Sequence, residues 1–352
     1  MVAVELEQPV RTAAALLEWS RAVVDPPLRA AVASLPDSTA HLVEYHFGWR
    51  DAAGAPAREY GGKAVRPLLT LLAARAAGAE ASGPGGGEAA SIEAAVPAAV
   101  AVELVHNFSL VHDDIMDGDR TRRHRATLWT VHGAGPAILA GDAMLALAYQ
   151  TIAPDVRAAA VLGAAVQRLI DGQLADLAFE RRGDVTPAGC LAMAEAKTGA
   201  LLAAATELGA LAGGASPAAR ARLARFGSLA GLAFQFADDL LGIWGDPAVT
   251  GKPVRSDLRS GKKSLPVVAA LSSGEPAATR LAELYAGGSG LAGADAARAA
   301  DLIEECGARA WCQARADALL DEALRELASV EAPASAEQEL GAVARLLARR
   351  SH

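Results

Sequence analysis

Long stretches of the chain are dominated by apolar residues, and short runs rich in glycine and proline separate them. In the stretch 92–117, Leu104, Phe108 and Val111 recur at four- and three-residue spacing, as apolar positions do on one face of a helix. This stretch ends abruptly in acidic residues, beginning with Asp113. The pattern therefore predicts an apolar helix whose carboxyl end carries negative charge.

Apolar stretches of similar length predict further helices. Their expected ranges are 5–34 with an interruption at Pro26-Pro27, 38–47 capped by Ser38 or Thr39, 63–77, 136–153, 156–180, 187–213 and 217–244. Loops are expected at 48–62, 78–87, 245–264 and 287–293, with a break near Pro333. Alanine and leucine dominate, and aromatic residues make up only 4%, which favours helix over sheet. The sequence therefore predicts an all-α protein.

Composition and charge narrow the class of protein. The chain has 352 residues, 52% of them hydrophobic, so it can bury a large core, and a single helical domain over 1–352 is the simplest expectation. A net charge of −8 gives no indication of nucleic acid or an anionic membrane as a partner. The apolar runs 134–153 and 198–215 carry Asp142 and Glu207, so we expect core helices there and no integral membrane association.

The cysteines and the first residues bear on the compartment. Cys190, Cys306 and Cys312 are an odd number without the spacing of a metal site, which indicates a reduced protein. The first residues lack the charged and apolar blocks of a signal peptide. We therefore expect a soluble cytoplasmic protein.

The acidic end of the stretch 92–117 is the first candidate for chemistry. Asp113 and Asp117 should project from one helix face about one turn apart, with Asp114 beside them. Like charges at this spacing oppose helix formation, so a cation is expected, and carboxylates without nearby cysteine or paired histidine suit magnesium. Several arginines, which can fork onto phosphate, follow within a few residues: Arg120, Arg122, Arg123 and Arg125. Together these residues describe a site for a metal-bound diphosphate.

The alternative is a solvated acidic helix end without a ligand. Against it stands a second copy of the pattern, because the apolar stretch 223–241 closes on Asp238 and Asp239. Unpaired carboxylates are costly to bury, so two such helices are hard to explain as surface features. If they face each other, they would form one polynuclear metal site.

Seven motifs in order carry a resemblance to a known family. They are GGKAVRP at 61–67, ELVHNFSLVHDDIMD at 103–117, the pair Arg122-Arg123, GQLAD at 172–176, KTGAL at 197–201, FQFADDLL at 234–241 and GKPVRSDLRSGKKSLP at 251–266. Over about residues 60–271 the chain resembles the trans-isoprenyl diphosphate synthases of the polyprenyl synthetase family. The resemblance implies a class I isoprenoid synthase bundle around a central cavity, a homodimer, and a prenyltransferase that joins allylic diphosphates to isopentenyl diphosphate.

The resemblance also implies roles for individual residues. Asp113 and Asp117 would hold two magnesium ions and Asp238 a third, supported by Asp114 and Asp239. The positive charges that would bind the allylic diphosphate are Arg122, Lys197, Lys252 and Lys262. The side chains that would align the diphosphate or the nascent cation are Gln173, Thr198 and Gln235, with Phe234 beside the reacting alkenes. Those that would bind isopentenyl diphosphate without a metal are Lys63, Arg66, His106 and Arg123. No side chain stands out as the final base, a role the family gives to the released diphosphate.

Some positions depart from the family pattern or stay open. Gly242 replaces the last aspartate of the second motif, from which we expect weaker metal affinity without inactivity. RRHRAT replaces the usual RRGxPT, with His124 for glycine, and Ala64-Val65 replaces a more usual basic and apolar pair. Asp257 could reach a metal through water. Arg120, Arg125 and the pair Arg349-Arg350 lack motif support and are expected to be solvated charges.

Product length should depend on the helix before Asp113. Phe108 lies five residues earlier, about 7.5 Å along the helix, and would form a floor for the growing tail beside the small Ser109. This arrangement resembles that of geranylgeranyl-type enzymes, so a twenty-carbon product is predicted, with farnesyl diphosphate as the alternative. Two other functions stay open. A class I terpene cyclase would need no second diphosphate pocket, and a non-catalytic partner subunit would be expected to lose its acidic motifs.

Overall fold

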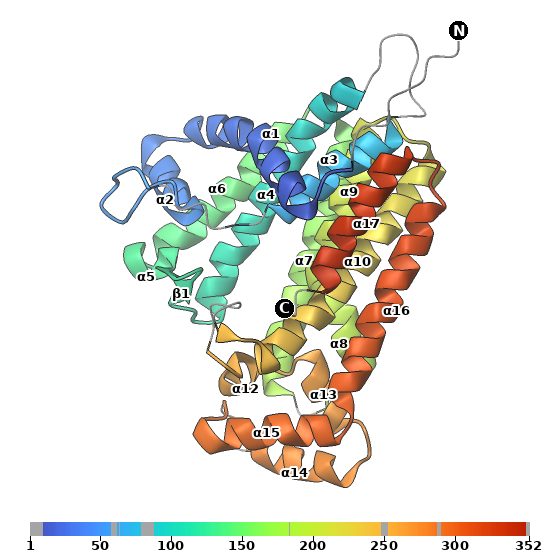
Figure 1. Ribbon diagram of the computed structural model, residues 1–352. Helices are drawn as coiled ribbons and strands as arrows, with labels where there is room; N and C mark the ends of the chain where they lie inside the picture. Colours follow the sequence, from blue (N-terminus) through green and yellow to red (C-terminus); the bar gives the residue numbers. More distant parts are fainter. Residues whose placement is uncertain are drawn as a thin grey trace. The chain divides into compact units, whose positions relative to one another are not determined.

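The computed structural model describes residues 10–57, 62, 64–78, 88–182, 184–247, 253–286 and 290–349. Over these residues the chain is helical except for loops and one hairpin, β1 (Thr121–Arg122) and β2 (Arg125–Ala126). The prediction of an all-α protein is therefore confirmed (Figure 1). Most of the predicted loop 78–87 lies outside the described residues, as do 58–61, 248–252, 287–289 and Lys63. The predicted loop 245–264 contains a short helix, α12 (Ser256–Ser260).

The chain divides into two compact units, each built from separated segments. Unit 1 comprises Met1–Ala164, Ala204–Ala224 and Val330–Ala342, and unit 2 comprises Ala165–Ala203, Arg225–Ser329 and Val343–His352.

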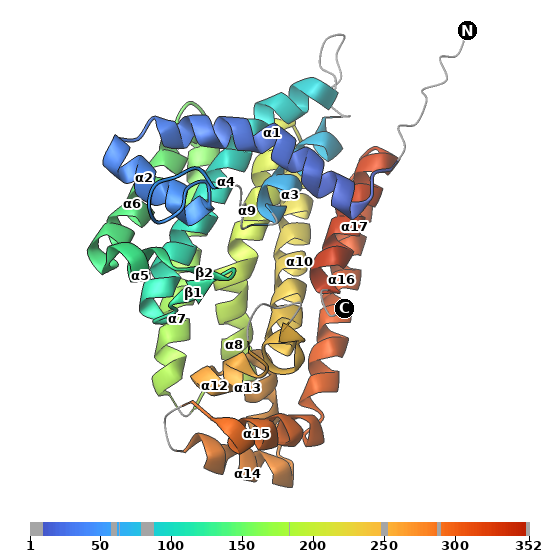
Figure 2. The same cartoon turned by 60° about the vertical axis from the view of Figure 1, so that its left-hand side comes forward.

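Unit 1 is organised around one long apolar helix. Its helices include α1 (Ala13–Ala33), α2 (Asp37–Phe47), α3 (Val65–Ala77), α4 (Glu88–Met116), α5 (Leu128–His132), α6 (Ala134–Ile152) and the first turns of α7 (Val156–Arg181). Helix α4 packs along α6 and α3, as Figures 1 and 2 show, and every residue of α3 from Pro67 to Ala77 is buried. Among the described helices, α4 is long and apolar enough to cross a membrane, but 67% of its most apolar window is buried, as in a core helix.

The start of the chain corrects two sequence predictions. Helix α1 continues through Pro26 and Pro27 although each proline removes one backbone donor. Val24 and Leu28, on either side of them, are at most 2% exposed, so packing of this face outweighs the lost hydrogen bonds. Helix α2 is capped by neither Ser38 nor Thr39. It begins at Asp37, because the carbonyl oxygen of Pro36 accepts the first hydrogen bonds.

Two glycines let helix α9 (Ala200–Ala212) approach α3 closely within unit 1. A Cβ atom at Gly209 would lie 2.0 Å from the carbonyl oxygen of Thr70, and one at Gly213 would lie 2.4 Å from that of Ala74. Both contacts are with backbone, so a side chain could be accommodated only if the helices moved apart.

Gly209→Ala is therefore expected to lower the free energy of unfolding by about 1–3 kcal/mol, the usual range for overpacking. The matched control is Gly163→Ala in α7, where the nearest atom to an added Cβ is the Tyr149 hydroxyl at 3.4 Å. The control should be stabilised by about 0.5–1 kcal/mol, since alanine is the better helix former. Urea unfolding of both variants checks the pair, and an equal effect of the two substitutions would contradict the close approach.

Unit 2 contains the larger part of α7, α8 (Pro187–Ala194), a π-helical turn at Glu195–Gly199, the start of α9 and most of α10 (Pro217–Trp244). It continues with α12 (Ser256–Ser260), α13 (Leu265–Leu271), α14 (Pro276–Tyr285), α15 (Gly293–Glu305) and α16 (Ala308–Ala328), and includes the end of α17 (Ala334–Ala348). One apolar cluster joins the end of α10 to α12–α15 through Ile243, Leu258, Val267, Leu281 and Ile303. Figure 2 shows α14 and α15 paired below α12 and α13.

Candidate active site

The first acidic motif lies at the carboxyl end of α4. The backbone nitrogen of Asp117 donates to the carbonyl oxygen of Asp113 at 2.8 Å, so the two residues lie one helical turn apart, as the spacing predicts. Asp117 is exposed and Asp113 is half-buried, whereas Asp114 between them is only 2% exposed. The motif therefore separates two accessible carboxylates from a buried one.

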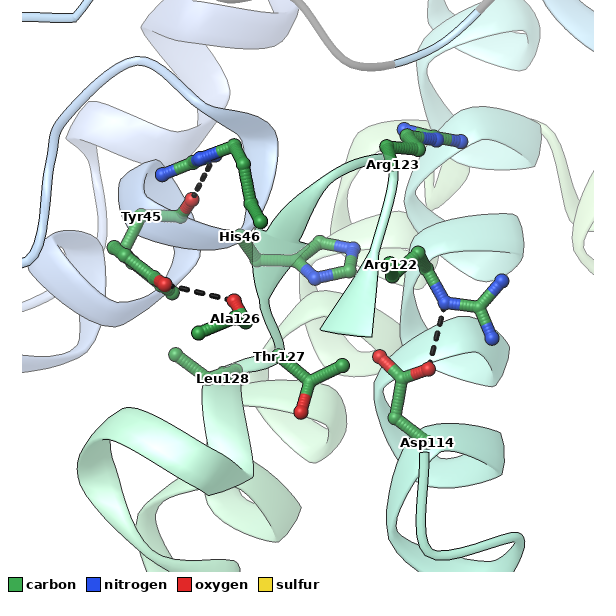
Figure 3. Close-up of a pocket in the computed structure, with 9 residues that line it drawn as sticks. Tyr45, His46, Asp114, Arg122, Arg123, Ala126, Thr127 and Leu128 are labelled. Carbon is green, nitrogen blue, oxygen red and sulfur yellow. Dashed lines mark hydrogen bonds and ion pairs between the residues drawn. The ribbon is translucent and has the colours of Figure 1, made fainter. Parts of the chain in front are cut away.

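The buried carboxylate belongs to an ion pair. Arg122 Nε donates to Asp114 Oδ1 at 2.6 Å, and Figure 3 shows the arginine turned toward the carboxylate. Burial raises the pKa of Asp114 to about 6, although the Arg122 charge opposes the shift. Asp114 thus fixes Arg122 at the edge of the acidic motif.

Arg122 stands on the β1–β2 hairpin, whose turn has an unusual backbone. Arg123 and His124 have φ angles of 52° and 62°, a left-handed conformation that costs non-glycine residues about 1–2 kcal/mol each. The hairpin nevertheless forms with His124 at the position where the resemblance leads us to expect glycine. The Tyr45 hydroxyl donates to the carbonyl oxygen of Ala126 at 2.7 Å. Contacts with α2 therefore fix the hairpin.

Arg125 is part of this attachment. Its guanidinium donates to the carbonyl oxygens of Tyr45 and Arg50, both at 3.1 Å, and stacks on the Tyr45 ring with a distance of 4.8 Å to the centroid. Arg125 is thus structural, where the sequence predicts a solvated charge.

Behind the hairpin lies a pocket that sequence reasoning missed in part. Its lining residues are Tyr45, His46, Asp114, Arg122, Arg123, Arg125, Ala126, Thr127 and Leu128 (Figure 3). His46 Nε2 lies 3.1 Å from Asn107 Oδ1, and the Asn107 amide donates to Glu103 Oε1 at 3.0 Å. Burial, reinforced by Arg123, lowers the pKa of His46 to about 3, so the ring is neutral. The sequence signal for His46 is its place in the aromatic run YHFGW.

Three of the four residues expected to bind isopentenyl diphosphate come together in unit 1. Burial and the charges of Arg66 and Arg123 hold the pKa of His106 well below its usual range. A Cβ at Gly62 would lie 3.1 Å from Arg123 Nη1, so Arg123 also lies beside the segment that leads to Lys63. The arrangement is a basic cluster with a neutral histidine. Lys63 itself is outside the described residues.

The second acidic motif, like the first, combines an accessible aspartate with a buried one. Asp238 is exposed on α10, whereas Asp239 is 3% exposed. Asp239 accepts hydrogen bonds from Gln235 Nε2 at 2.7 Å and from the backbone nitrogen of Leu265 at 2.9 Å, and lies 3.9 Å from Lys262 Nζ. Burial raises the pKa of Asp239 to about 6, with Lys262 opposing the shift. Each motif thus combines a buried, anchored aspartate with a more accessible neighbour.

The π-helical turn presents two further predicted residues. Lys197 Nζ donates to Asp176 Oδ2 at 2.7 Å, and Thr198 Oγ1 donates to Gln235 Oε1 at 2.7 Å. A Cβ at Gly172 would lie 2.4 Å from the backbone nitrogen of Lys197, so α7 and the π turn touch through backbone. Thr198, Gln235 and Asp239 consequently form one hydrogen-bonded row.

Gln173 is an orphaned polar group. It is 6% exposed, and neither its side-chain oxygen nor its nitrogen has a hydrogen-bond partner among the described residues. Buried amides without partners are rare in folded proteins, so this side chain fits a role in contacting a ligand.

The donor set can be tested for magnesium. Among the residues that the structure describes, no three side chains of the types that bind metals cluster together, so a cage built by protein alone is absent there. Magnesium, however, is commonly held by one or two carboxylates together with substrate phosphates. Asp113 and Asp117 in unit 1 and Asp238 in unit 2 offer accessible carboxylates of this kind, so the residues fit the ion.

The remaining predicted residues are placed as follows. Phe108 is buried, with its ring 4.9 Å from that of His112, and the Ser109 hydroxyl donates to the carbonyl oxygen of His106 at 2.8 Å. Phe234 is half-buried on α10. Lys252 lies outside the described residues.

Comparison with known proteins identifies the family. Residues 52–302 match the family model of the polyprenyl synthetases. The chain is 44% identical to (2E,6E)-farnesyl diphosphate synthase of Mycobacterium tuberculosis, over 95% of this chain and 92% of that protein. It is 42% identical to geranylgeranyl diphosphate synthase of the same organism, over 97% and 95% of the two chains.

Solved structures agree in fold. A polyprenyl synthetase from Streptomyces coelicolor matches with a TM-score of 0.87 and 46% identity, over 95% of this chain and 99% of that one. Geranylgeranyl pyrophosphate synthase from Corynebacterium glutamicum, complexed with isoprenyl diphosphate and magnesium, matches with a TM-score of 0.80 and 27% identity, over 95% and 98%. The predicted isoprenoid synthase fold is confirmed. The chain therefore belongs to the polyprenyl synthetase family and is a trans-prenyl diphosphate synthase.

Proposed function

We propose that this synthase ionises an allylic diphosphate held by magnesium and couples it to isopentenyl diphosphate to give geranylgeranyl diphosphate. The observation that carries the proposal is the repeated acidic arrangement. In both motifs the second aspartate is buried beside a basic side chain, Arg122 or Lys262, and its neighbour is more accessible. This division supports Asp113, Asp117 and Asp238 as magnesium ligands, with Asp114 and Asp239 as their supports.

The metal would neutralise the leaving diphosphate, which is the chemistry a Lewis acid supplies at such a site, and prenyl diphosphate synthases are in general metal-dependent. The complexed Corynebacterium structure supports magnesium, with three ions expected per active site. Arg122, Lys197 and Lys262 would add fixed positive charge around the same group. Gln173, Thr198 and Gln235 would orient it with their hydrogen-bonding groups.

Isopentenyl diphosphate would bind without metal in the basic cluster of Arg66, His106 and Arg123, together with Lys63. Because burial keeps His106 neutral, its ring can donate one hydrogen bond to an anion without adding charge. The proton lost after coupling would pass to the released diphosphate. This second pocket is what distinguishes a synthase from a cyclase.

The synthase is proposed to act as a cytoplasmic homodimer. Val131, Ile138 and Leu139 on α5 and α6 are 37%, 43% and 67% exposed, an apolar surface of the kind that subunit interfaces cover. Cys190, Cys306 and Cys312 are free thiols, as expected in a reducing compartment. We also propose that the two units act as one domain, since α7, α9 and α10 each contribute residues to both.

The product profile of purified enzyme with magnesium, isopentenyl diphosphate and each allylic diphosphate in turn tests the proposal. Geranylgeranyl diphosphate should dominate. A fifteen-carbon product would assign the chain to the farnesyl type, and hydrocarbon from geranylgeranyl diphosphate alone would indicate a cyclase. Protein that is inactive alone but alters the product of another synthase would indicate a partner subunit.

Phe108→Ala is expected to lengthen the main product by one or more five-carbon units, because it removes a buried ring from the helix that precedes Asp113. Chromatography of the dephosphorylated products measures the change. Leu110→Ala, on another side of α4, is the matched control and should keep the wild-type length. An unchanged product length in Phe108→Ala would show that this side chain does not limit the growth of the prenyl chain.

A further inference from the structure

His46 on α2 lies before the residues that match the family model. That match begins at residue 52, so the family likeness does not reach this side chain. Its ring nevertheless lines the pocket behind the β1–β2 hairpin together with Arg122 and Arg123, as Figure 3 shows. A histidine that shares a pocket with arginines of the candidate site needs a physical explanation.

The hydrogen bonds around His46 determine which of its nitrogens carries the proton. Asn107 Nδ2 donates to the backbone oxygen and to Oε1 of Glu103, at 2.8 Å and 3.0 Å, which uses both of its N–H groups. Asn107 Oδ1 can only accept, so His46 Nε2 is the donor across the distance of 3.1 Å. Burial and the Arg123 charge lower the pKa of His46 to about 3, so the ring is neutral and its one N–H group is on Nε2. His46, Asn107 and Glu103 thus form one hydrogen-bonded chain, the His46 row.

The His46 row ends at a buried carboxylate on α4. Asn107 and Glu103 are 1% and 4% exposed and lie one helical turn apart, with His106 between them in the chain. Burial raises the pKa of Glu103, and the charges of Arg66 and Arg123 oppose the shift, so the carboxyl group interacts electrostatically with both arginines. The row therefore joins the pocket to the basic cluster.

Each end of the row bears on a group expected to bind isopentenyl diphosphate. At one end, the neutral ring forms part of the wall of the pocket that Arg123 also lines, and it adds no positive charge there. At the other end, the bonds between Asn107 and Glu103 restrain the turn of α4 that carries His106. Loss of the ring would leave a space in the pocket wall and a buried Asn107 oxygen without its donor.

We propose that His46 is a positioning residue for isopentenyl diphosphate, and that as a neutral donor to Asn107 and a wall of the Arg123 pocket it fixes the arrangement of the basic cluster. The inference rests on the proposed function and adds to it a residue from outside the matched region. Because the His46 row contains none of the proposed magnesium ligands, it should affect the binding of one substrate and not the ionisation of the other.

The test is steady-state kinetics in which the KM of each substrate is measured at a saturating concentration of the other. His46→Ala should raise the KM of isopentenyl diphosphate by about tenfold or more, a common effect of a misplaced binding group, and should leave kcat and the KM of the allylic diphosphate within about twofold. His41→Ala is the control, because His41 is also half-buried on α2, and it should change neither KM.

Two conservative variants separate the hydrogen bond from the rest of the ring. The amide nitrogen of glutamine lies about as far from the backbone as His46 Nε2, whereas that of asparagine lies near the position of Nδ1. His46→Gln should therefore still donate to Asn107 and keep the KM of isopentenyl diphosphate within about threefold of wild type, while His46→Asn should resemble His46→Ala. In an Asn107→Ala background, His46→Ala should raise this KM much less than it does in the wild type, since the acceptor is gone.

An unchanged KM of isopentenyl diphosphate in His46→Ala, or equal increases in the KM of both substrates, would overturn the inference. So would a His46→Gln variant as impaired as His46→Ala, or additive effects of His46→Ala and Asn107→Ala. Failure of the proposed function is distinguishable. In that case the wild-type enzyme would form no prenyl diphosphate, or Arg123→Ala would leave the KM of isopentenyl diphosphate unchanged.

Discussion

Asp113→Asn is expected to lower kcat by about a hundredfold to a thousandfold at saturating magnesium and substrates. The change keeps the shape of the side chain but replaces a charged oxygen donor with a neutral amide. Loss of one preorganised group that stabilises charge in a transition state commonly has this effect. Asp113 is accessible at the end of α4 while its neighbour Asp114 is committed to Arg122, so Asp114 cannot take its place.

Steady-state kinetics with both diphosphates measures the loss. Asp142→Asn is the matched control, because Asp142 is exposed on α6 and lies 3.8 Å from His112, the residue before Asp113. The control should retain wild-type kcat. A variant Asp113→Asn with kcat within a few-fold of wild type would show that the first motif does not hold the metal.

Glu339→Gln is expected to lower the free energy of unfolding by about 3–5 kcal/mol, the usual effect of breaking a buried ion pair from one side. The Glu339 and Arg75 side chains are 1% and 4% exposed and contact each other. Arg11 adds three hydrogen bonds to the Glu339 carboxylate, from its backbone nitrogen at 3.0 Å and from Nε and Nη2, each at 2.9 Å. Glutamine would leave the buried Arg75 charge with only the more exposed Glu88 carboxylate, 2.6 Å from its Nε, and urea unfolding measures the result.

The stability that the Glu339 carboxylate contributes should depend on pH. Burial would raise the pKa of Glu339, but hydrogen bonds from Arg11 and the Arg75 charge outweigh it and lower the pKa below its ordinary value of 4.5. Stability from the ionised group is therefore present above pH 4.5 and is lost as pH falls through the lowered pKa. The difference between wild type and Glu339→Gln should shrink below pH 4.5. Glu331→Gln, exposed and close in sequence, should show no such trend.

The long helices could be predicted because their signal is local. Helix α10 occupies 217–244 as the sequence predicts, since an apolar face and flanking Pro217 and Gly245 define it without tertiary information. The short elements α5 and α12, the hairpin and the π turn could not be predicted. Each is held by distant partners, as when Leu258 of α12 packs into a cluster with Ile243.

The candidate site likewise has features that the sequence predicts and features that it does not. The one-turn spacing of Asp113 and Asp117 follows from helix geometry alone, and the structure has it. The contact between Gly242 and Asp257 joins α10 to α12 across a loop, and the His46–Asn107 contact joins α2 to α4. Sequence spacing contains no information about either contact.

The interleaved course of the chain has a consequence for biosynthesis. Glu339 in α17 follows Arg11 by 328 residues and Arg75 by 264 residues. Because synthesis runs from the amino end, this part of unit 1 can close only after α17 has been made, although Glu88 is available to Arg75 much earlier.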